Sequence, residues 1–416
     1  MFADLKSWLA WQETLHPNSI DLGLDRIRAV LQRLQFHSPQ CPVITIAGTK
    51  GKGSTAALLG SIYSAAGYRA GVFTSPHLRR YNERIQINQQ EVSDETLCVA
   101  FERINAARGD VSLTYFEFNT LAALLAFSTA NLDVWILEVG MGGRLDAVNV
   151  IDADVAMVTS IGIDHTEWLG SDLESIGREK AGIFRTDRPA LYGGTEMPAS
   201  IQRVAEQTRA ALLRAGQDFD FQAHDTSWSW WMQSPIATIS FSDLPIPAIS
   251  GGIQLRNASL SLAAVQLLAQ RLSVSRAALD QGLRSVSLEG RFQRIQSQSI
   301  PDAQWILDVA HNPMSAAVLA MHLKELAPPK RKIVAIIGML SNKDVQGTLG
   351  ALSPLIDAWI ATGLSQSRAL TGAKMVAHLH DCNAKVIGSA EDVVAACKLA
   401  KDHAKPGDCI LICGFV

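Results

Sequence analysis

Short apolar runs alternate with helix-like stretches along the chain, and this alternation most constrains the possible folds. The first runs lie at 42–48, 69–75, 133–140 and 154–162, and each is long enough for a buried strand. Strands that alternate with helices are usually joined by crossovers into a parallel sheet. The sequence therefore predicts an α/β fold. The intervening helices are expected at 54–66 and 120–130.

A second series of strands begins near residue 300, which indicates two domains with a ligand cleft between them. We place the domains at 1–287 and 288–416. Alternating apolar residues over 222–250 predict a small β meander, in which the tryptophans are expected to serve packing: Trp228, Trp230 and Trp231. The strands expected in the second domain are 305–310, 332–338, 357–362, 384–388 and 408–414.

Composition excludes several classes of function. The 416 residues carry a net charge of −3, so nothing basic favours nucleic acid or an anionic membrane. The six cysteines show no CxxC spacing and are typical of a reduced, cytosolic protein. Residues 1–16 lack the apolar core of a signal peptide, and no apolar run is long enough to span a bilayer. We therefore expect a cytoplasmic protein without nucleic-acid or membrane partners.

Residues 47–55 read AGTKGKGST and follow the first predicted strand directly. Glycines there let backbone N–H groups turn inward, and the helix that follows adds its positive end. Lys52 could reach the β- and γ-phosphates of a nucleotide. The standard P-loop has Ser or Thr after the Gly-Lys pair, whereas Gly53 stands here. A phosphate cradle is favoured over a turn without ligand, but its metal must be held from elsewhere.

Polar residues at the ends of neighbouring strands are candidates for that metal. Ser75, Glu138 and His165 each follow an apolar run. Ligands gather at the carboxyl ends of strands in an open α/β sheet, and a hard cation prefers oxygen donors. Each residue also has an ordinary interpretation: Ser75 as a turn cap, Glu138 paired with Arg144, His165 at the surface. Their common topological position favours function.

Residues 171–184 are predicted to be helical, with Ser171 or Asp172 as N-cap. Leu173, Ile176 and Lys180 would share one apolar face. A buried amine tends to lose its proton, and a neutral amine can react with carbon dioxide to give a carbamate. Periodicity alone favours the simpler alternative, a buried lysine paired with Glu138 or Glu179.

Eight motifs occur in the order typical of one family. They are AGTKGKGST, SPHLRRYNERIQ, ILEVGMGGRLDAVN, TSIGIDHTEWLG, REKAGIF, GRFQ, DVAHNP and IIGMLSNKD. This chain resembles the bacterial dihydrofolate synthases/folylpolyglutamate synthases of the Mur ligase superfamily, from residue 21 to the last strand. The resemblance implies a P-loop Mur-ligase-type domain at 1–287 with a mainly parallel sheet and the meander. A Rossmann-like α/β domain at 288–416 would complete the nucleotide and glutamate site.

The family resemblance also implies a reaction. ATP phosphorylates the carboxylate of dihydropteroate or of a folate, and the amine of L-glutamate attacks the acyl phosphate to form an amide. Such an enzyme holds three reactants in line and neutralises the migrating phosphoryl group. The implied cofactors are ATP and Mg²⁺, with Lys180 carbamylated, and the implied assembly is a monomer.

Site residues carried over from the resemblance fall into four groups. Those with catalytic roles are Lys52, Lys180 and His165. The nucleotide contacts are Thr49, Lys50, Gly51, Lys52, Gly53, Ser54, Asn257, Arg291, Asp308 and His311. The magnesium ligands are Ser75, Glu138 and His165. The pterin-side residues are Asp21, Leu22, Gly23, Leu24, Thr114, Tyr115, Phe116, Glu117, Leu145, Asp146 and Ala147.

Two departures from the family accompany these assignments. Lys50 stands where many bacterial members have Asn, and another cation beside a triphosphate is expected to be tolerated. Members also usually continue past the last strand with a Gly-Ser-Phe turn and a helix, whereas 411–416 read LICGFV. The missing turn and helix put the stability of the second domain and its glutamate binding in question, and either the chain is naturally short or the sequence is truncated.

Other functions are kept as alternatives. A Mur-type ligase acting on a UDP-muramoyl substrate shares the ATP site but should lack the pterin-side segments. The pterin-side segments also have ordinary interpretations: residues 114–117 could be the start of a helix, and residues 21–24 could open another helix. A nucleotide-dependent switch rests only on NKD at 342–344, which lacks the spacing of a guanine-reading motif. A small-molecule kinase would stop at phosphoryl transfer.

Overall fold

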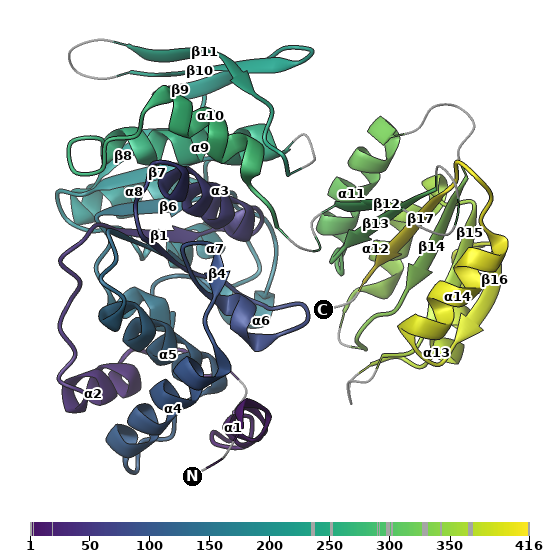
Figure 1. The fold of residues 1–416 in the computed structure, drawn as a ribbon, viewed down its shortest axis with the longest axis horizontal. Helices are drawn as coiled ribbons and strands as arrows, with labels where there is room; N and C mark the ends of the chain where they lie inside the picture. The colour runs from purple at the N-terminus through teal and green to yellow at the C-terminus, as the bar shows by residue number, and fades with distance from the viewer. Residues whose placement is uncertain are drawn as a thin grey trace. The chain divides into compact units, whose positions relative to one another are not determined.

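The computed structural model describes residues 2–414 with short gaps. The gaps are 3, 19, 234–237, 250–252, 289, 291, 297–299, 301–302, 327–331, 342 and 365–368. The chain divides into two compact units (Figure 1). The first comprises 1–248 and 253–286, and the second comprises 287–416 with 249–252.

An eight-stranded sheet forms the centre of the first unit, in the order β4-β3-β2-β5-β1-β6-β7-β8. The six strands from β2 to β8 in this order are parallel, and the β3–β4 hairpin adds antiparallel strands at one edge. The bounds are β1 Val43–Ala47, β2 Ala70–Phe73, β3 Ile85–Ile87, β4 Gln90–Glu91, β5 Val134–Glu138, β6 Val155–Val158, β7 Pro189–Tyr192 and β8 Ala211–Arg214.

Every residue of the central strands β1, β2, β5 and β6 is buried, which explains their continuous apolar runs. The four strands predicted in this domain are confirmed. The short strands β3, β4, β7 and β8 were not predicted, because none of them has such a long apolar run.

Helices cover both faces of this sheet (Figure 1). The helix predicted at 120–130 begins earlier, because Thr114 caps it and Glu117 completes a capping box. The helices of the unit are α1 Leu5–Gln12, α2 Asp25–Arg33, α3 Lys52–Ala65, α4 Asp94–Arg108, α5 Tyr115–Thr129, α6 Thr166–Leu169, α7 Leu173–Ala181, α8 Ala199–Thr208, α9 Ile253–Leu267 and α10 Arg276–Ser285, with 3-10 turns η1 Tyr81–Arg84 and η2 Ala147–Val150.

The predicted meander is confirmed as an antiparallel three-stranded sheet. Its strands are β9 Phe219–Ala223, β10 Ser227–Met232 and β11 Ile239–Pro245. Trp228 and Trp230 are buried against it, whereas Trp231 on the other face is half-buried. The indole N–H of Trp230 donates to the Ser259 carbonyl oxygen at 3.1 Å, so the meander is fixed to α9. Two of the three tryptophans therefore serve packing, as predicted.

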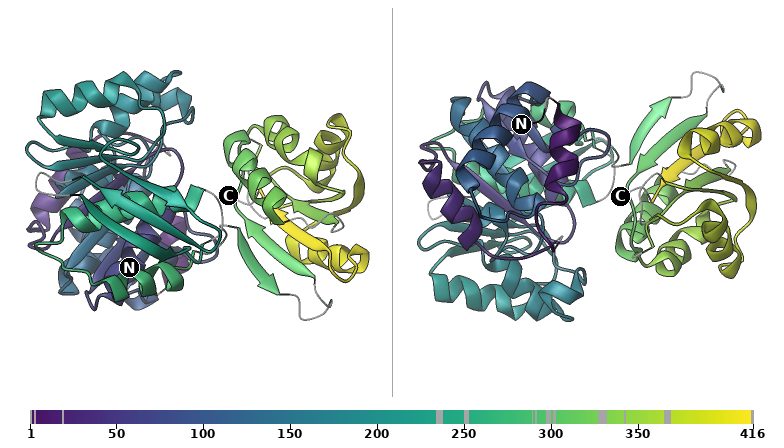
Figure 2. Two further views of the ribbon diagram at one scale, coloured as in Figure 1. Left: turned by 90° about the horizontal axis from the view of Figure 1, so that it is seen from above. Right: turned by 90° about the horizontal axis from the view of Figure 1, so that it is seen from below.

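The second unit contains a six-stranded sheet in the order β12-β13-β17-β14-β15-β16. Its antiparallel edge pair β12–β13 appears in Figure 2. All five predicted strands are confirmed, and β12 is an addition. The bounds are β12 Gln293–Gln296, β13 Gln304–Asp308, β14 Ile333–Ile337, β15 Ala358–Thr362, β16 Val386–Ala390 and β17 Cys409–Cys413, with helices α11 Pro313–Leu326, α12 Val345–Leu352, α13 Gly372–Asp381 and α14 Val393–His403 and the 3-10 turn η3 Ser353–Leu355.

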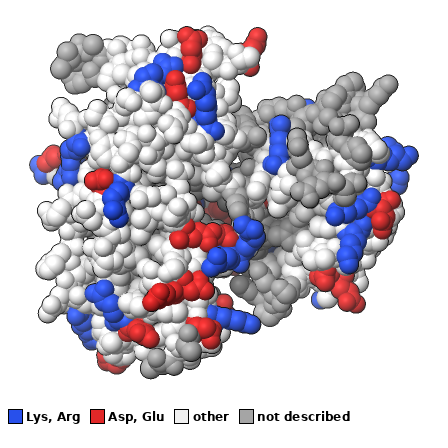
Figure 3. Space-filling view, in the orientation of Figure 1, with Lys and Arg blue, Asp and Glu red and all other residues white. Residues whose placement is uncertain are grey.

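The two faces of this second sheet bury separate apolar clusters. Trp359 and Leu349 belong to one cluster, and Trp305 and Ala396 belong to the other. This is the layered arrangement expected of a Rossmann-like domain. On the face of the molecule shown in Figure 3, acidic and basic side chains lie close together, in keeping with the small net charge.

Candidate active site

The phosphate cradle, residues 48–54, connects β1 to α3. Gly51 has a φ of 90° and precedes the first residue of the helix. A Cβ atom there would lie 2.5 Å from Asn257 Oδ1, so only glycine fits. The helix begins at Lys52, two residues before the predicted start. Lys52 and Gly53 therefore belong to its first turn, where free backbone N–H groups favour an anion.

The cradle is fixed to the loop that follows β6. The Thr49 hydroxyl donates to the Gly162 carbonyl oxygen at 3.2 Å and accepts from the Gly162 N–H at 3.0 Å. Thr159 Oγ1 donates to the Lys50 carbonyl oxygen at 2.6 Å, and the Lys50 N–H donates to Ser160 Oγ at 3.2 Å. These bonds hold the backbone of the loop in one conformation before any ligand binds.

Helix α9 packs its first turns against the cradle. Asn257 is buried and donates through Nδ2 to Gln254 Oε1 at 2.9 Å. Gln254 in turn donates to Ser54 Oγ at 3.4 Å. The structure therefore brings the predicted nucleotide residues Asn257 and Ser54 together. Gln254 was not predicted, although its position one helical turn before Asn257 could have indicated it.

Two lysines converge on one backbone oxygen of the cradle. Lys52 Nζ and Lys180 Nζ donate to the Gly48 carbonyl oxygen at 3.1 and 3.0 Å. Lys180 is buried, and this burial, assisted by the charge of Lys52, lowers the pKa of its amine to about 7. A large fraction of the amine is therefore neutral near pH 7, the form that reacts with carbon dioxide.

The surroundings of Lys180 correct two expectations. Glu179 accepts from Arg144 at 2.9 Å, so the cation paired with Glu179 is Arg144, whereas Lys180 donates to the Gly48 carbonyl oxygen. Leu173 is 44% exposed, which contradicts its predicted place on the buried face. It is the first residue of α7, directly after the Asp172 cap, and the apolar face is covered only from Ile176 onward.

The predicted metal ligands lie at the ends of adjacent strands. In the sheet, β2, β5, β1 and β6 are consecutive; Glu138 is the last residue of β5, and Ser75 and His165 follow β2 and β6. Glu138 is buried, and its Oε2 accepts from the Ser75 N–H at 3.1 Å. A Cβ atom on Gly53 would lie 3.6 Å from the same oxygen. The structure therefore brings Ser75 and Glu138 to the cradle.

A carboxylate and a serine hydroxyl beside a phosphate cradle are donors that fit Mg²⁺. Within the described ranges, no three His, Cys, Asp or Glu side chains gather closely enough to hold a metal ion. This does not test the predicted ligands, because only two of them, Glu138 and His165, are of these residue types. His165 is the N-cap before α6 and has the left-handed conformation, with φ of 51°; its side chain is 46% exposed. His165 therefore lies at the surface, as its ordinary interpretation predicted.

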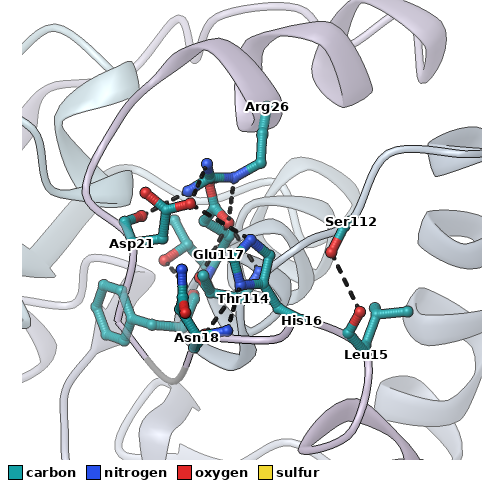
Figure 4. Close-up of polar contacts among 10 residues, drawn as sticks. Leu15, His16, Asn18, Asp21, Arg26, Ser112, Thr114 and Glu117 are labelled. Atoms are coloured by element: carbon teal, nitrogen blue, oxygen red, sulfur yellow. Dashed lines mark hydrogen bonds and ion pairs between the residues drawn. The ribbon is translucent and has the colours of Figure 1, made fainter.

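The pterin-side segments, distant in sequence, meet around Arg26 (Figure 4). Arg26 Nη1 donates to Asp21 Oδ2 at 2.8 Å, and Nε donates to the Glu117 carboxylate at 3.1 and 3.2 Å. Glu117 also accepts from the Thr114 N–H at 2.8 Å. We call Asp21, Arg26, Thr114 and Glu117 the pterin-side network. Arg26 was not predicted, although it lies only two residues past the predicted segment.

The third predicted segment adjoins this network through backbone contacts. The Gly23 N–H donates to the Leu145 carbonyl oxygen at 3.2 Å. Asp146 is buried and accepts from the Met141 and Val148 N–H groups at 2.9 and 3.0 Å. Burial raises the pKa of Asp146 to about 6, although these hydrogen bonds oppose the rise. The ordinary interpretations of the first two segments are also observed, since Thr114 caps α5 and residues 21–24 immediately precede α2.

In the second unit, Asp308 ends β13 and accepts from the Phe292 and Ala310 N–H groups at 2.9 and 2.8 Å. His311 lies next to α11, with Nδ1 2.9 Å from the Val309 carbonyl oxygen. Both predicted nucleotide contacts therefore lie at the carboxyl end of one strand. Arg291, the third one predicted nearby, lies outside the described residues.

Comparison with known proteins identifies the family. The Mur ligase middle domain matches residues 46–192, and the Mur ligase glutamate ligase domain matches residues 290–415. The dihydrofolate synthase/folylpolyglutamate synthase of Escherichia coli K12 is 46% identical over 410 residues, which cover 99% of this chain and 92% of that protein. This chain belongs to the dihydrofolate synthase/folylpolyglutamate synthase family. The resemblance inferred from the eight motifs is confirmed.

Further relatives agree with this assignment. The family member of Haemophilus influenzae is 38% identical over 427 residues, covering 99% of this chain and 94% of that protein. The structure of E. coli FolC in complex with DHPP and ADP has a TM-score of 0.90 at 44% identity, covering 99% of this chain and 95% of that one. A bifunctional enzyme with Mn, AMPPNP and L-glutamate bound has a TM-score of 0.88 at 42% identity, with the same coverage. The predicted fold class is confirmed.

None of the helices among the described residues is long and apolar enough to cross a bilayer.

Proposed function

We propose that this protein joins L-glutamate to 7,8-dihydropteroate, forming dihydrofolate, and adds further glutamates to folates. A carboxylate oxygen of the acid attacks the γ-phosphorus of ATP, and ADP leaves. The glutamate nitrogen then attacks the acyl carbon, phosphate leaves, and the nitrogen loses a proton. The observation that carries this proposal is the full-length identity of 46% to an enzyme of that name.

Residues of the phosphate cradle have the first role in this reaction. The N–H groups at the start of α3 would bind the phosphates, and Lys52 would offset charge on the γ-phosphate. Lys50, Gly51 and Ser54 shape the same loop. Ser75, Glu138 and His165 would hold Mg²⁺, which neutralises charge on the phosphoryl group when bound. Manganese and AMPPNP bound in the similar structure support a site for ATP and a divalent metal in this protein.

Lys180 would act as a carbamate. Its neutral Nζ attacks the carbon of CO₂, a proton is released, and a carboxylate forms beside the cradle. Support comes from the lowered pKa of about 7 and from the Nζ position, 3.0 Å from the Gly48 carbonyl oxygen. Labelled bicarbonate should give a carbamate signal in the NMR spectrum of the wild type and none in Lys180→Ala.

The pterin-side segments would bind the dihydropteroate ring. Asp146 is an acceptor in a dry surrounding, suited to the N–H groups of a pterin. Tyr115 and Phe116 supply aromatic rings at the start of α5. Asp308 and His311 remain predicted nucleotide contacts of the second unit. The proposed compartment is the cytoplasm and the proposed assembly a monomer.

The test is incubation with ATP, Mg²⁺, dihydropteroate and glutamate, followed by mass analysis of the pteridine product. A mass increase of one glutamyl residue, with phosphate release that requires both acid and amine, is expected. Phosphate release with the acid alone would instead indicate a kinase, and release with neither would indicate a nucleotide switch. Product formation only with a UDP-muramoyl acid would favour the other Mur-type ligases.

A further inference from the structure

Arg84 is a buried cation between two elements of the proposed site. It ends the 3-10 turn η1 and is only 8% exposed. Its Nε donates to His77 Nδ1 at 2.7 Å, and its guanidinium carbon lies 5.8 Å from the ring centroid of Tyr115. His77 lies two residues after Ser75, and Tyr115 belongs to a pterin-side segment. Arg84 therefore connects the metal side with the pterin side.

Arg84 has no anionic partner among the described residues. Its single hydrogen bond goes to a neutral acceptor, the imidazole nitrogen of His77. The neighbouring carboxylate of Glu83 is occupied, because it accepts from the backbone N–H groups of 78, 79 and 80 at 2.6, 2.7 and 2.6 Å. The rings of Tyr81 and Tyr115, at 5.9 and 5.8 Å, offer only cation–π contact.

The pterin-side network provides the contrast. Arg26 is more exposed, yet its guanidinium donates to two carboxylates, Asp21 and Glu117. Buried charges in proteins are normally paired in this way, since an uncompensated one is costly. Arg84 departs from the rule at a position next to the proposed chemistry. Both Nη groups remain without an acceptor in the described part of the chain.

We propose that Arg84 binds a carboxylate of a substrate through its Nη groups. A guanidinium fork matches a carboxylate in bidentate geometry. The carboxylate of the acid substrate must lie between the pterin ring and the phosphoryl group, which is where Arg84 stands. Glutamate supplies the same chemistry, and the experiment separates the two sources. This inference rests on the proposed function.

The first measurement uses the wild type. Dihydropteroate and an analogue that lacks the carboxylate are titrated by calorimetry, with ADP and Mg²⁺ present. We expect the carboxylate to improve affinity by about ten- to a hundredfold, the size of a hydrogen-bonded charge contact. In Arg84→Met this ratio should fall to near one, while Arg84→Lys should keep part of it. Arg188→Met, which removes an exposed arginine paired with Asp154, should keep the full ratio.

Steady-state kinetics of Arg84→Met show which substrate supplies the carboxylate that Arg84 binds. A raised KM for dihydropteroate with unchanged KM for glutamate and ATP assigns the acid. A raised KM for glutamate alone, with equal affinity for the two pteridines, assigns glutamate. Melting temperatures of the ligand-free variants separate binding from folding. If Arg84→Met loses thermal stability while both KM values and the affinity ratio stay at wild-type values, Arg84 serves the fold alone and the proposal is overturned.

Failure of the proposed function would look different. A wild type that binds dihydropteroate but forms no glutamyl product contradicts the ligase proposal and leaves the affinity ratio measurable. If Arg84→Met does not fold, the proposal is tested by the wild-type ratio of affinities for the two pteridines and by the kinetics of Arg84→Lys. Equal wild-type affinity for both pteridines, with an unchanged glutamate KM in Arg84→Lys, also overturns the proposal.

Discussion

Arg26 and Lys180 are cations of the same unit, but their surroundings differ. Arg26 is enclosed by two carboxylates and a backbone oxygen, at distances of 2.5 to 3.2 Å. Lys180 shares one carbonyl oxygen with a second amine, and burial lowers its pKa to about 7. The charge of Arg26 is thus compensated by its neighbours without a ligand. The cradle brings two amines together, an arrangement that favours binding of an anion.

The largest effect is expected from the cradle side of this comparison. Lys180→Ala removes the group that would become the carbamate, so turnover should fall by at least about a hundredfold, as for other preorganised charge-stabilising groups. Phosphate release with saturating substrates is the measurement, and bicarbonate should not restore it. Lys374→Ala in α13 serves as control. Wild-type turnover in Lys180→Ala would refute the carbamate role.

The metal assignment predicts the next effect. Glu138→Gln keeps the shape of the side chain but removes the charge that would face Mg²⁺. The Mg²⁺ concentration for half-maximal rate should rise by about tenfold or more, by analogy with weakened metal sites. The measurement is a Mg²⁺ titration of the rate, with the exposed Glu95→Gln as control. An unchanged titration curve would place the metal elsewhere.

On the pterin side, the main loss should be in stability. Arg26→Met leaves the buried carboxylate of Glu117 without its cation, and the free energy of unfolding should fall by about 2 kcal/mol. Denaturant titration measures it. Adding Glu117→Gln to this variant should restore part of the loss, because the uncompensated charge is removed as well. Simple additivity of the two changes would show that the network is not coupled.

The smallest expected effect, counted per pH unit, is a pH dependence of stability from Lys180. Its pKa is about 7 in the folded protein and 10.5 as its ordinary value, so the unfolded chain binds more protons between these values. The free energy of unfolding should therefore rise with pH across this window, by at most about 1.4 kcal/mol per pH unit.

This contribution should be missing in Lys180→Met, measured by urea unfolding at pH 7, 8 and 9 in buffer freed of carbon dioxide. Below about pH 6, where the amine is protonated in both the folded and the unfolded chain, wild type and variant should show the same slope. Parallel curves over the whole range would mean that the amine is not perturbed by burial.

Sequence reasoning recovered most of the buried architecture. The central strands were predictable because residues buried on both faces form continuous apolar runs, as in Val134–Glu138. Edge strands such as β8 Ala211–Arg214 lack that signal, since its residues are only half-buried or exposed. The exposure of Leu173 was missed because periodicity shows which residues share a face but not where coverage of that face begins.

The sequence by itself determined the family, the glycine-rich turn between β1 and α3 and the set of strand-end residues, because these depend on local residue types and spacing. Only the tertiary structure decided which of them meet. It inserts β5 between β2 and β1, and so brings Glu138 to Ser75 and Gly53. It also leaves Arg26 with two counter-charges and Arg84 with none among the described residues. Charge pairing depends on distances of a few ångströms between residues far apart in the chain, and linear spacing does not contain them.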